Sequence, residues 1–273
     1  MSVLYSSKKL ALLGCILFAF CYPYQLYNSF IYTESLFFSL SVIYSCYLLN
    51  SNPFTFKKIT LLFLLLLLLC ITRPTGIFFL GATIIYASIR LSNHISLLKR
   101  IAIFIALSAA GLYILNMLMG SGAGFDIILP FRDERIICEV PTLPYEVNIK
   151  TTSNNNSLYG LFYYITHNFE QFSRLAWLKS KAFFGLTRTY YSTGHNIFIV
   201  CFFYPLYVFI ILAIARFKRT IPLSFIYFIS LTVIFWLSVV FSCDEWHNRF
   251  FLALTPFLII PALYLFTKKN INQ

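Results

Sequence analysis

Long apolar stretches alternate with short polar links along most of the chain. Eight stretches have the length and composition of helices, at residues 10–30, 34–49, 59–72, 74–89, 101–119, 196–215, 221–241 and 250–266. About 20 apolar residues in a helix cross a bilayer core of about 30 Å, and the alternating strands typical of membrane barrels are absent. The pattern predicts an all-α, polytopic integral membrane bundle whose first helix is kinked at Pro23.

The distribution of charge orients these helices. The chain is 59% hydrophobic and 11% charged, with a net charge of +12. Twelve of its 21 basic residues lie in short links that contain none of its nine acidic residues. By the positive-inside rule these links face the cytoplasm, so all carboxylates and the long loop 120–195 lie outside, between membrane helices in 1–119 and 196–273. The positive charge thus reflects topology, and no nucleic-acid partner is expected.

The second half of the outer loop predicts an amphipathic helix that begins with Asn168 as N-cap. Arg174, Lys181 and Arg188 recur every seven residues on one side, if the helix extends that far, and Lys179 interrupts the apolar side. A helix of this type lies in a membrane interface. Two interpretations stay open: the cations bind the headgroups of anionic membrane lipids, or they face a phosphate-bearing ligand.

The positions of cysteine and histidine residues give little indication of a disulfide or a metal site. Of seven cysteines, only Cys138 and Cys243 fall on the predicted outer side, where an oxidising compartment would permit a disulfide between them. Whether they pair is left open by the sequence. No cysteine or histidine spacing is typical of a zinc site, and neither a divalent metal nor another cofactor is indicated.

Arg73 is a charge at an unexpected depth. It follows Lys58 by fifteen residues, a helical rise of roughly 22 Å, so it falls short of the far surface of a core about 30 Å thick. Pro74 and Gly76 break the backbone there, which is tolerated only where protein or a water-filled cavity covers it. The guanidinium either snorkels to the interface or binds a phosphate with two donors.

Two further outer links bring charge to the same face. Glu34 follows Thr33, a good N-cap, and its carboxylate in the first turn of a helix is also explained by the helix dipole. The link CDEWHNRFF contains Asp244, His247 and Arg249, which could equally be charges of a solvated loop. The convergence of three links predicts an outward-facing polar site that includes Glu34, Arg73 and this cluster.

Four segments of the chain resemble the GT-C glycosyltransferases, in the same order as in that family. They are YPYQLYNSFIYTESLFFSL, ITRPTGIFF, FFGLTRTYYSTGHN and HNRFFLALTPFL. The family comprises multi-span enzymes that use polyprenyl-phosphate sugars, among them protein and lipid mannosyltransferases. The resemblance covers most of the chain and implies transfer of a sugar from a lipid phosphate to a lipid, glycan or protein acceptor.

The resemblance also implies roles for single residues. Arg73 and Arg249 would contact the lipid phosphate, and Glu34 would support the cavity. The cations Arg174, Lys181 and Arg188 would border the entrance for the donor. Asp244 and His247, which come from the charged outer link and not from the resemblance, complete the predicted substrate-binding set.

One feature departs from the family pattern. The acidic catalytic residues of the family lie in a first outer loop that precedes the segment resembling TESLF, whereas Glu34 is the first acidic residue of this chain. The catalytic base is therefore not assigned. The chain resembles the C-terminal two-thirds of the family, as a truncated form, a remnant, or one half of a pair with a separate N-terminal partner chain.

Two other functions compete with the glycosyltransferase hypothesis. A polymerase or ligase of surface polysaccharide also carries long outer loops and scattered arginines, but the order of the four segments argues against it. A non-enzymatic lipid-binding or transport protein would place polar groups in the middle of several helices, which these largely lack. The compact loops favour a bacterial inner membrane, with the active face outward, over the endoplasmic reticulum.

Overall fold

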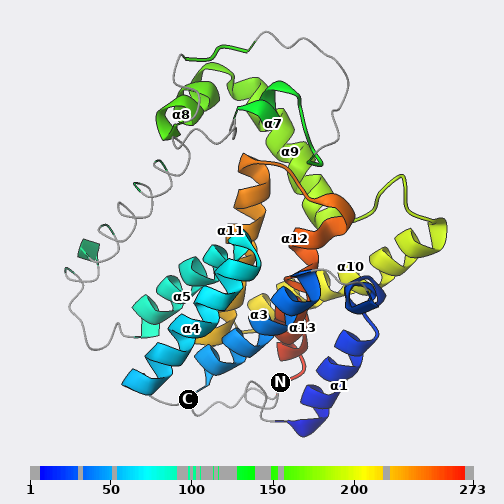
Figure 1. The fold of residues 1–273 in the computed structure, drawn as a ribbon. Helices are drawn as coiled ribbons and strands as arrows, with labels where there is room; N and C mark the ends of the chain where they lie inside the picture. The colour runs from blue at the N-terminus through cyan, green and yellow to red at the C-terminus, as the bar shows by residue number, and fades with distance from the viewer. Residues whose placement is uncertain are drawn as a thin grey trace. The chain divides into compact units, whose positions relative to one another are not determined.

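The computed structural model is all-α over the residues that it describes, which are 7–29, 33–50, 54–90, 128–138, 149–152, 157–217, 222–267 and the single positions 98, 101, 102, 105, 113 and 116. Figure 1 shows its helices: α1 (Lys8–Ala19), α2 (Tyr22–Gln25), α3 (Thr33–Leu49), α4 (Phe56–Thr72), α5 (Ile77–Arg90), α7 (Leu129–Arg132), α8 (Leu158–His167), α9 (Phe169–Gly185), α10 (Thr193–Arg216), α11 (Leu223–Phe241), α12 (Arg249–Leu252) and α13 (Thr255–Tyr264). Three 3₁₀ turns, η1 (Leu26–Ser29), η2 (Pro74–Gly76) and η3 (Trp246–Asn248), complete this part of the chain.

Most of the predicted helices are present with small shifts of their ends. The predicted kink at Pro23 is a break, because α1 ends at Ala19 and Pro23 lies in the first turn of α2. The predicted helix 250–266 is likewise two helices, with Pro256 in the first turn of α13. The predicted helix 101–119 falls mostly outside the described residues.

The chain forms two compact units. Unit 1 consists of Met1–Ile89, Thr187–Phe235 and Arg249–Gln273, and unit 2 of Arg90–Leu186 and Trp236–Asn248. These boundaries differ from the division at residues 120 and 195, since unit 2 also takes the end of α11 and the link that follows it.

Aromatic rings fill the core of unit 1. Phe79 of α5 contacts Phe37, Phe235 and Phe257 edge to face, with ring centroids 5.9 to 6.1 Å apart. Such pairs add about 0.5–1.5 kcal/mol each beyond the area that they bury. Because the four rings come from α3, α5, α11 and α13, this cluster fixes those helices against one another.

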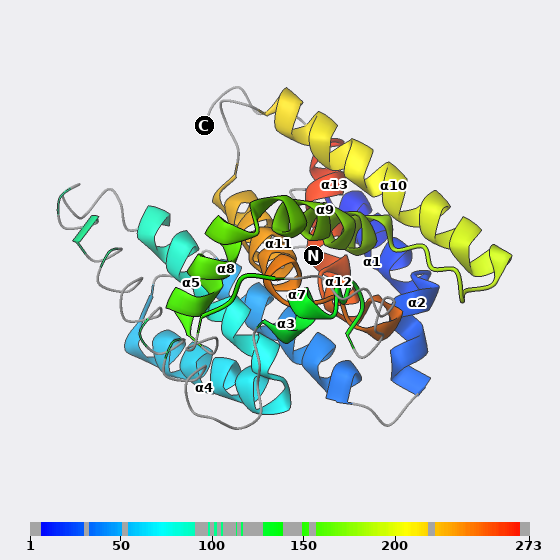
Figure 2. The ribbon, with the colours of Figure 1, turned by 90° about the horizontal axis from the view of Figure 1, so that it is seen from above.

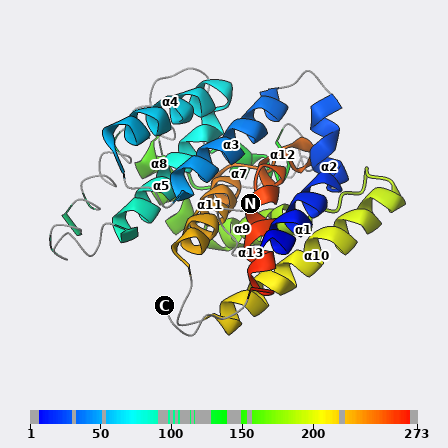
Figure 3. The ribbon, with the colours of Figure 1, turned by 90° about the horizontal axis from the view of Figure 1, so that it is seen from below.

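Helices α3 and α4 form an antiparallel hairpin, visible in Figure 3 as neighbouring blue and cyan helices. At the closed end, the Lys58 Nζ donates to the carbonyl of Asn50 at 2.8 Å, which satisfies a backbone acceptor after the last turn of α3. Both helices have 17 residues. Their far ends are therefore level, and the start of α3 meets the end of α4.

Among the residues that the structure describes, two helices are long and apolar enough to cross a membrane. These are α10, with 24 residues, and α11, with 19 residues. In both, more than half of the apolar window stays outside the protein interior. An apolar surface of that extent is typical of contact with lipid or a partner.

Unit 2 is built around the elements α7, α8 and α9, which Figure 2 shows in green. Its core contains Ile128, Phe131, Tyr164 and Leu175. Cys138 and Cys243, whose pairing the sequence left open, form a disulfide with their Cα atoms 5.2 Å apart. The two segments of chain that meet there form an isolated parallel bridge between Ile137 and Asp244.

The predicted amphipathic helix is shorter than its charge pattern suggested. It ends at Gly185, where Leu186 has a φ of 62° and is followed by non-helical chain. Arg188 therefore does not continue the side that carries Arg174 and Lys181. The side chain of Asn168 does not cap the helix, because it accepts from the backbone N–H of Lys150 at 2.9 Å.

Candidate functional site

A buried carboxylate joins two arginines at the open end of the α3–α4 hairpin in unit 1. The Oε1 atom of Glu34 accepts a hydrogen bond from Nη1 of Arg73 at 3.2 Å and forms an ion pair with Nη1 of Arg249, also at 3.2 Å. The Glu34 side chain is only 4% exposed. Two cations around one carboxylate leave this cluster with a net charge of +1.

Helix geometry explains why Glu34 and Arg73 meet. Glu34 lies in the first turn of α3, and Arg73 is the residue that ends α4. Arg73 has an extended backbone, with φ −151° and ψ 137°, because the ring of Pro74 disfavours helical geometry in the residue before it. Since the hairpin ends are level, this break directs the chain of Arg73 past the start of α3.

Gly76 allows the tight turn that follows Arg73. A Cβ atom on Gly76 would lie 2.6 to 2.7 Å from backbone atoms of Leu69 and Cys70, closer than such atoms approach in proteins. The Gly76 N–H also donates to the carbonyl of Arg73 at 2.9 Å. A residue without a side chain is thus required for η2 to fold back on α4 and hold Arg73 in place.

Arg249 reaches the cluster from a third link. It begins α12 directly after His247 and Asn248, which both have left-handed backbones with φ of 56° and 57°. Arg249 also donates a hydrogen bond to the hydroxyl of Tyr27, which lies in η1. The Tyr27 hydroxyl therefore lies beside the guanidinium group of Arg249.

Tyr191 and Arg188 extend the same polar region of unit 1. Burial raises the pKa of Tyr191, and the positive charge of Arg188 acts against that rise while the nearby Tyr27 adds to it. The Arg188 backbone is fixed, because its N–H donates to Asn196 Oδ1 at 3.1 Å and its carbonyl accepts from Asn196 Nδ2 at 2.9 Å. Arg188, predicted to lie on the amphipathic helix, instead belongs to this region.

The other predicted site residues belong to unit 2. Asp244 is buried, and its backbone N–H and carbonyl bond to Ile136 and Cys138 at 2.8 Å. Arg174 is paired with Glu134, and Lys181 is exposed on α9. His247 lies in η3 with a left-handed backbone. The structure thus brings together Glu34, Arg73 and Arg249, whereas Asp244, His247, Arg174 and Lys181 are placed in the other unit.

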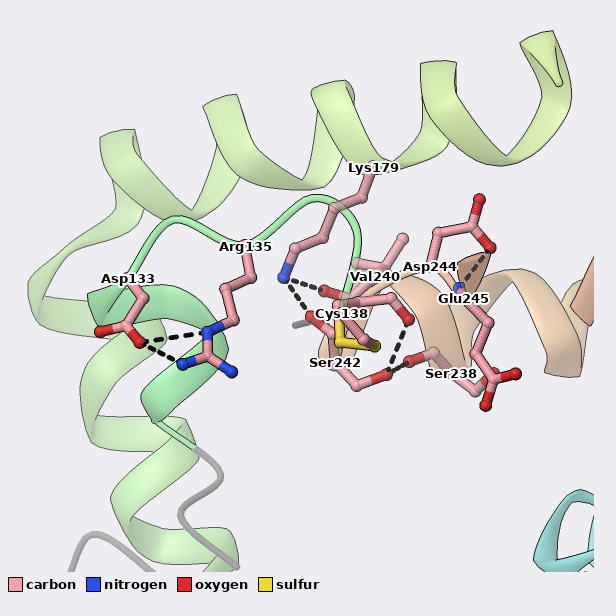
Figure 4. The surroundings of a disulfide bond; sticks show 10 residues. Asp133, Arg135, Cys138, Lys179, Ser238, Val240, Ser242, Asp244 and Glu245 are labelled. Carbon is pink, nitrogen blue, oxygen red and sulfur yellow. Dashed lines mark hydrogen bonds and ion pairs between the residues drawn. A yellow bond between two sulfur atoms is a disulfide. The ribbon is translucent and has the colours of Figure 1, made fainter. Parts of the chain in front are cut away.

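Lys179 is a buried cation of unit 2 (Figure 4). Its Nζ donates to the carbonyls of Ser242 at 2.5 Å and Val240 at 3.5 Å, and it lies 4.1 Å from the ring centroid of Phe131. The side chain is fully buried, and desolvation lowers the pKa of Lys179 from 10.5 to about 7. It holds the backbone beside the disulfide and explains why a lysine interrupts the apolar side of α9.

Sequence reasoning did not find Tyr27 or Tyr191. Both are tyrosines in aromatic-rich segments, YPYQLYNS and TRTYYS, where the residue type alone gives no signal of a polar contact. Their only detectable signal was membership in two of the four segments of the family resemblance.

The chemistry of the cluster favours an anionic ligand. A pair of guanidinium groups presents planar forks of N–H donors that match the oxygens of phosphate. The described residues contain no group of three or more histidine, cysteine or acidic side chains that could hold a metal ion. Comparisons with family models, curated proteins and solved structures found no match.

Proposed function

We propose that this protein is a membrane glycosyltransferase-like protein that binds a polyprenyl-phosphate sugar. The phosphate of the donor lies against Arg73 and Arg249. The observation that carries this proposal is the buried carboxylate of Glu34 between two guanidinium groups, because it leaves an excess positive charge in a site fixed by three separate links. The family resemblance supplies the identity of the donor.

An apolar exterior supports a membrane location for this site. Helices α10 and α11 have the length and composition of spans. On α4 the side opposite the buried Leu62 and Leu69 exposes large apolar side chains, namely Ile59, Phe63, Leu64, Leu67, Leu68 and Ile71. A helix that is apolar all round in sequence and leaves one side uncovered by protein is typical of a membrane span. We infer a bundle of about eight spans in a bacterial inner membrane, with the arginine cluster at the outer end.

The proposed reaction requires a base and a stabilised leaving group. A base takes the proton of the acceptor hydroxyl, whose oxygen attacks the anomeric carbon of the donor sugar. The bond from that carbon to the phosphate oxygen breaks, and the lipid phosphate leaves with the electron pair. Arg73 and Arg249 stabilise the charge that develops on the phosphate.

The base is the part of this mechanism that unit 1 does not supply. Glu34 is the only carboxylate side chain among the residues assigned to unit 1, and it is paired with two arginines as a structural counter-ion. A base would come from a separate chain that contributes an acidic outer loop. This observation favours a second function, the binding of a lipid-linked sugar phosphate without transfer.

Binding of an undecaprenyl-phosphate probe to the full chain in lipid nanodiscs tests the shared element of both functions. Arg73→Ala and Arg249→Ala should each weaken binding at least tenfold, since a lost charge-assisted hydrogen bond costs about 1.5–3 kcal/mol. Arg216→Ala is the matched control, because that arginine belongs to unit 1 and bonds the carbonyl of Leu265. Undecaprenol, which lacks the phosphate, should bind weakly to all variants.

Two outcomes separate the alternatives. Transfer of sugar from the lipid phosphate by the chain, alone or with a co-purified partner, supports the enzyme. Binding without transfer under both conditions supports the binding protein. Equal affinity of the unsubstituted protein and both arginine variants for the phosphate probe is incompatible with either function.

A further inference from the structure

Helix α9 is held against the last turns of α11 by contacts within unit 2. Lys179 donates to the carbonyls of Val240 and Ser242, at the C-terminal end of α11. Phe172 stacks on Phe241, with ring centroids 6.0 Å apart. The middle of α9 is therefore fixed at the level where α11 ends.

The length of α11 sets that level relative to a membrane. Its 19 residues rise about 28 Å, close to the thickness of a bilayer core of about 30 Å. The end of α11 thus lies near the boundary between acyl chains and headgroups, and α9 lies there with it. This step rests on the proposed membrane location of α11.

Contacts with Trp236 show which flank of α9 faces the acyl chains. The Trp236 Nε1 donates to Ser180 Oγ at 2.9 Å, and its ring lies 6.3 Å from that of Phe184. Trp236 precedes Ser242 by six residues, so it lies roughly 9 Å deeper along α11. The flank with Ser180 and Phe184 therefore points toward the membrane core, and the flank with Lys179 points away.

Trp177 shares the inward flank. It lies three residues before Ser180 and seven before Phe184, spacings that place side chains on one side of a helix. Trp177 is 71% exposed and Phe184 is 37% exposed. Lys181 is exposed one turn beyond Trp177. Aromatic rings with one polar atom are favoured at membrane interfaces, and a lysine there extends its ammonium to the phosphates.

We propose that Trp177, Lys181 and Phe184 form a docking face for anionic phospholipid of the outer leaflet. The two rings enter the upper acyl region, and the Lys181 ammonium pairs with headgroup phosphate. Arg174, which points to the same side of α9, is held by Glu134 and contributes less. The lipid is recognised by its negative charge, and all residues of the docking face belong to unit 2.

Quenching of Trp177 by brominated lipids tests this face in the full chain. Emission of the Trp177→Phe variant is subtracted from that of the unsubstituted protein, which removes the contribution of Trp236 and Trp246. In nanodiscs with brominated acyl chains, the difference spectrum should lose most of its intensity. Brominated phosphatidylglycerol should quench it more strongly than brominated phosphatidylcholine.

Lysine variants then test the choice of lipid. Lys181→Gln should lower the preference for phosphatidylglycerol about fivefold, the factor that one lysine near an anionic surface contributes. Lys150→Gln is the matched control, because Lys150 is also an exposed lysine of unit 2, and it should leave the preference unchanged. An equal preference in both variants would overturn the assignment of anionic lipid.

An unquenched Trp177 would overturn the docking face. Resistance of the protein to alkaline extraction from membranes, measured on the same sample, reports on the membrane location alone. An extracted protein would refute the membrane location and this face together. An unquenched Trp177 in a resistant protein would refute only this face.

Discussion

Two cation sites, one in each unit, stabilise positive charge in different ways. In unit 1, Arg73 and Arg249 share the carboxylate of Glu34, so two cations face one counter-charge. In unit 2, Lys179 contacts backbone carbonyls and the face of Phe131. The carbonyl contacts of Lys179 serve the fold, whereas the arginines are binding candidates because two guanidinium groups share one carboxylate.

The cost of burial also differs between them. An ammonium among carbonyl dipoles recovers only part of its lost hydration, which is why desolvation lowers the pKa of Lys179 to about 7. A guanidinium stays charged in proteins and needs a partner of opposite sign when it is buried. The first arrangement is sensitive to pH, and the second is sensitive to the loss of any one partner.

Removal of both arginines should have the largest effect on stability. Arg73→Ala together with Arg249→Ala leaves Glu34 buried without a counter-charge, at a cost of about 3–5 kcal/mol in the free energy of unfolding. Adding Glu34→Gln should restore most of that loss, because it removes the stranded charge. The free energy of unfolding is measured in mixed micelles for the unsubstituted protein, the double variant and the triple variant. A triple variant no more stable than the double would contradict the proposed role of Glu34.

Substitution of Lys179 should change how stability depends on pH. Its pKa is lower in the folded chain, so between pH of about 7 and about 10 the unfolded chain binds more protons. The free energy of unfolding of the unsubstituted protein should therefore rise over that range, by about 2–4 kcal/mol from this group.

The Lys179→Met variant keeps the length of the side chain without a titrating group. Its melting temperature should lack this part of the rise, and its difference from the unsubstituted protein should be constant below pH of about 7. Glu34→Gln at the other cluster provides the comparison. A Lys179→Met protein with the same pH profile as the unsubstituted one would show that Lys179 does not titrate in this range.

Gly76→Ala tests whether geometry, and not charge alone, makes the arginine site. The added methyl group would press on the backbone of Leu69 and Cys70, which should cost about 1–3 kcal/mol of stability and displace Arg73. Affinity for the undecaprenyl-phosphate probe should fall while all charges remain. Gly194→Ala is the control, since no atom lies within 4 Å of its added Cβ. Unchanged affinity in Gly76→Ala would show that the turn at Gly76 does not position the arginine site.

Arg174→Ala should have the smallest effect and sets the baseline for a surface ion pair. Arg174 is about half exposed and pairs with Glu134. Exposed pairs contribute about 0.2–1 kcal/mol because water and salt screen them. Arg174→Ala should lower the free energy of unfolding by an amount within that range, and this loss should disappear at high salt. A loss comparable to that of the double arginine variant would erase the contrast between exposed and buried pairs.

The charge positions in the sequence predicted that three outer links bring charge to one face, and the structure joins one residue from each link, Glu34, Arg73 and Arg249, by ion pairs. The level ends of the α3–α4 hairpin, which explain the contact between Glu34 and Arg73, were not part of that prediction. The same reasoning placed Asp244 and His247 with them, although they belong to unit 2. The spacing of charges says which end of a helix they occupy, but not which neighbour they face.

The amphipathic helix shows the limit of periodicity. Arg188 fits the seven-residue repeat of Arg174 and Lys181, yet the helix ends at Gly185. The sequence could not explain why Lys179 interrupts the predicted apolar side, because its partners, Ser242 and Val240, are more than 60 residues away along the chain. A local sequence pattern gives no information about a contact with a backbone carbonyl that is far away along the chain.

The sequence by itself determined the helices, the proline and glycine breaks, and the ends at which charge lies, because these depend on the local backbone and on short-range apolar patterns. Only the tertiary structure decided that Arg249 and Arg73 share Glu34, that Tyr27 joins them, and that Cys138 pairs with Cys243. Those contacts join residues far apart in the chain, and they form because aromatic packing and buried charges each admit few arrangements.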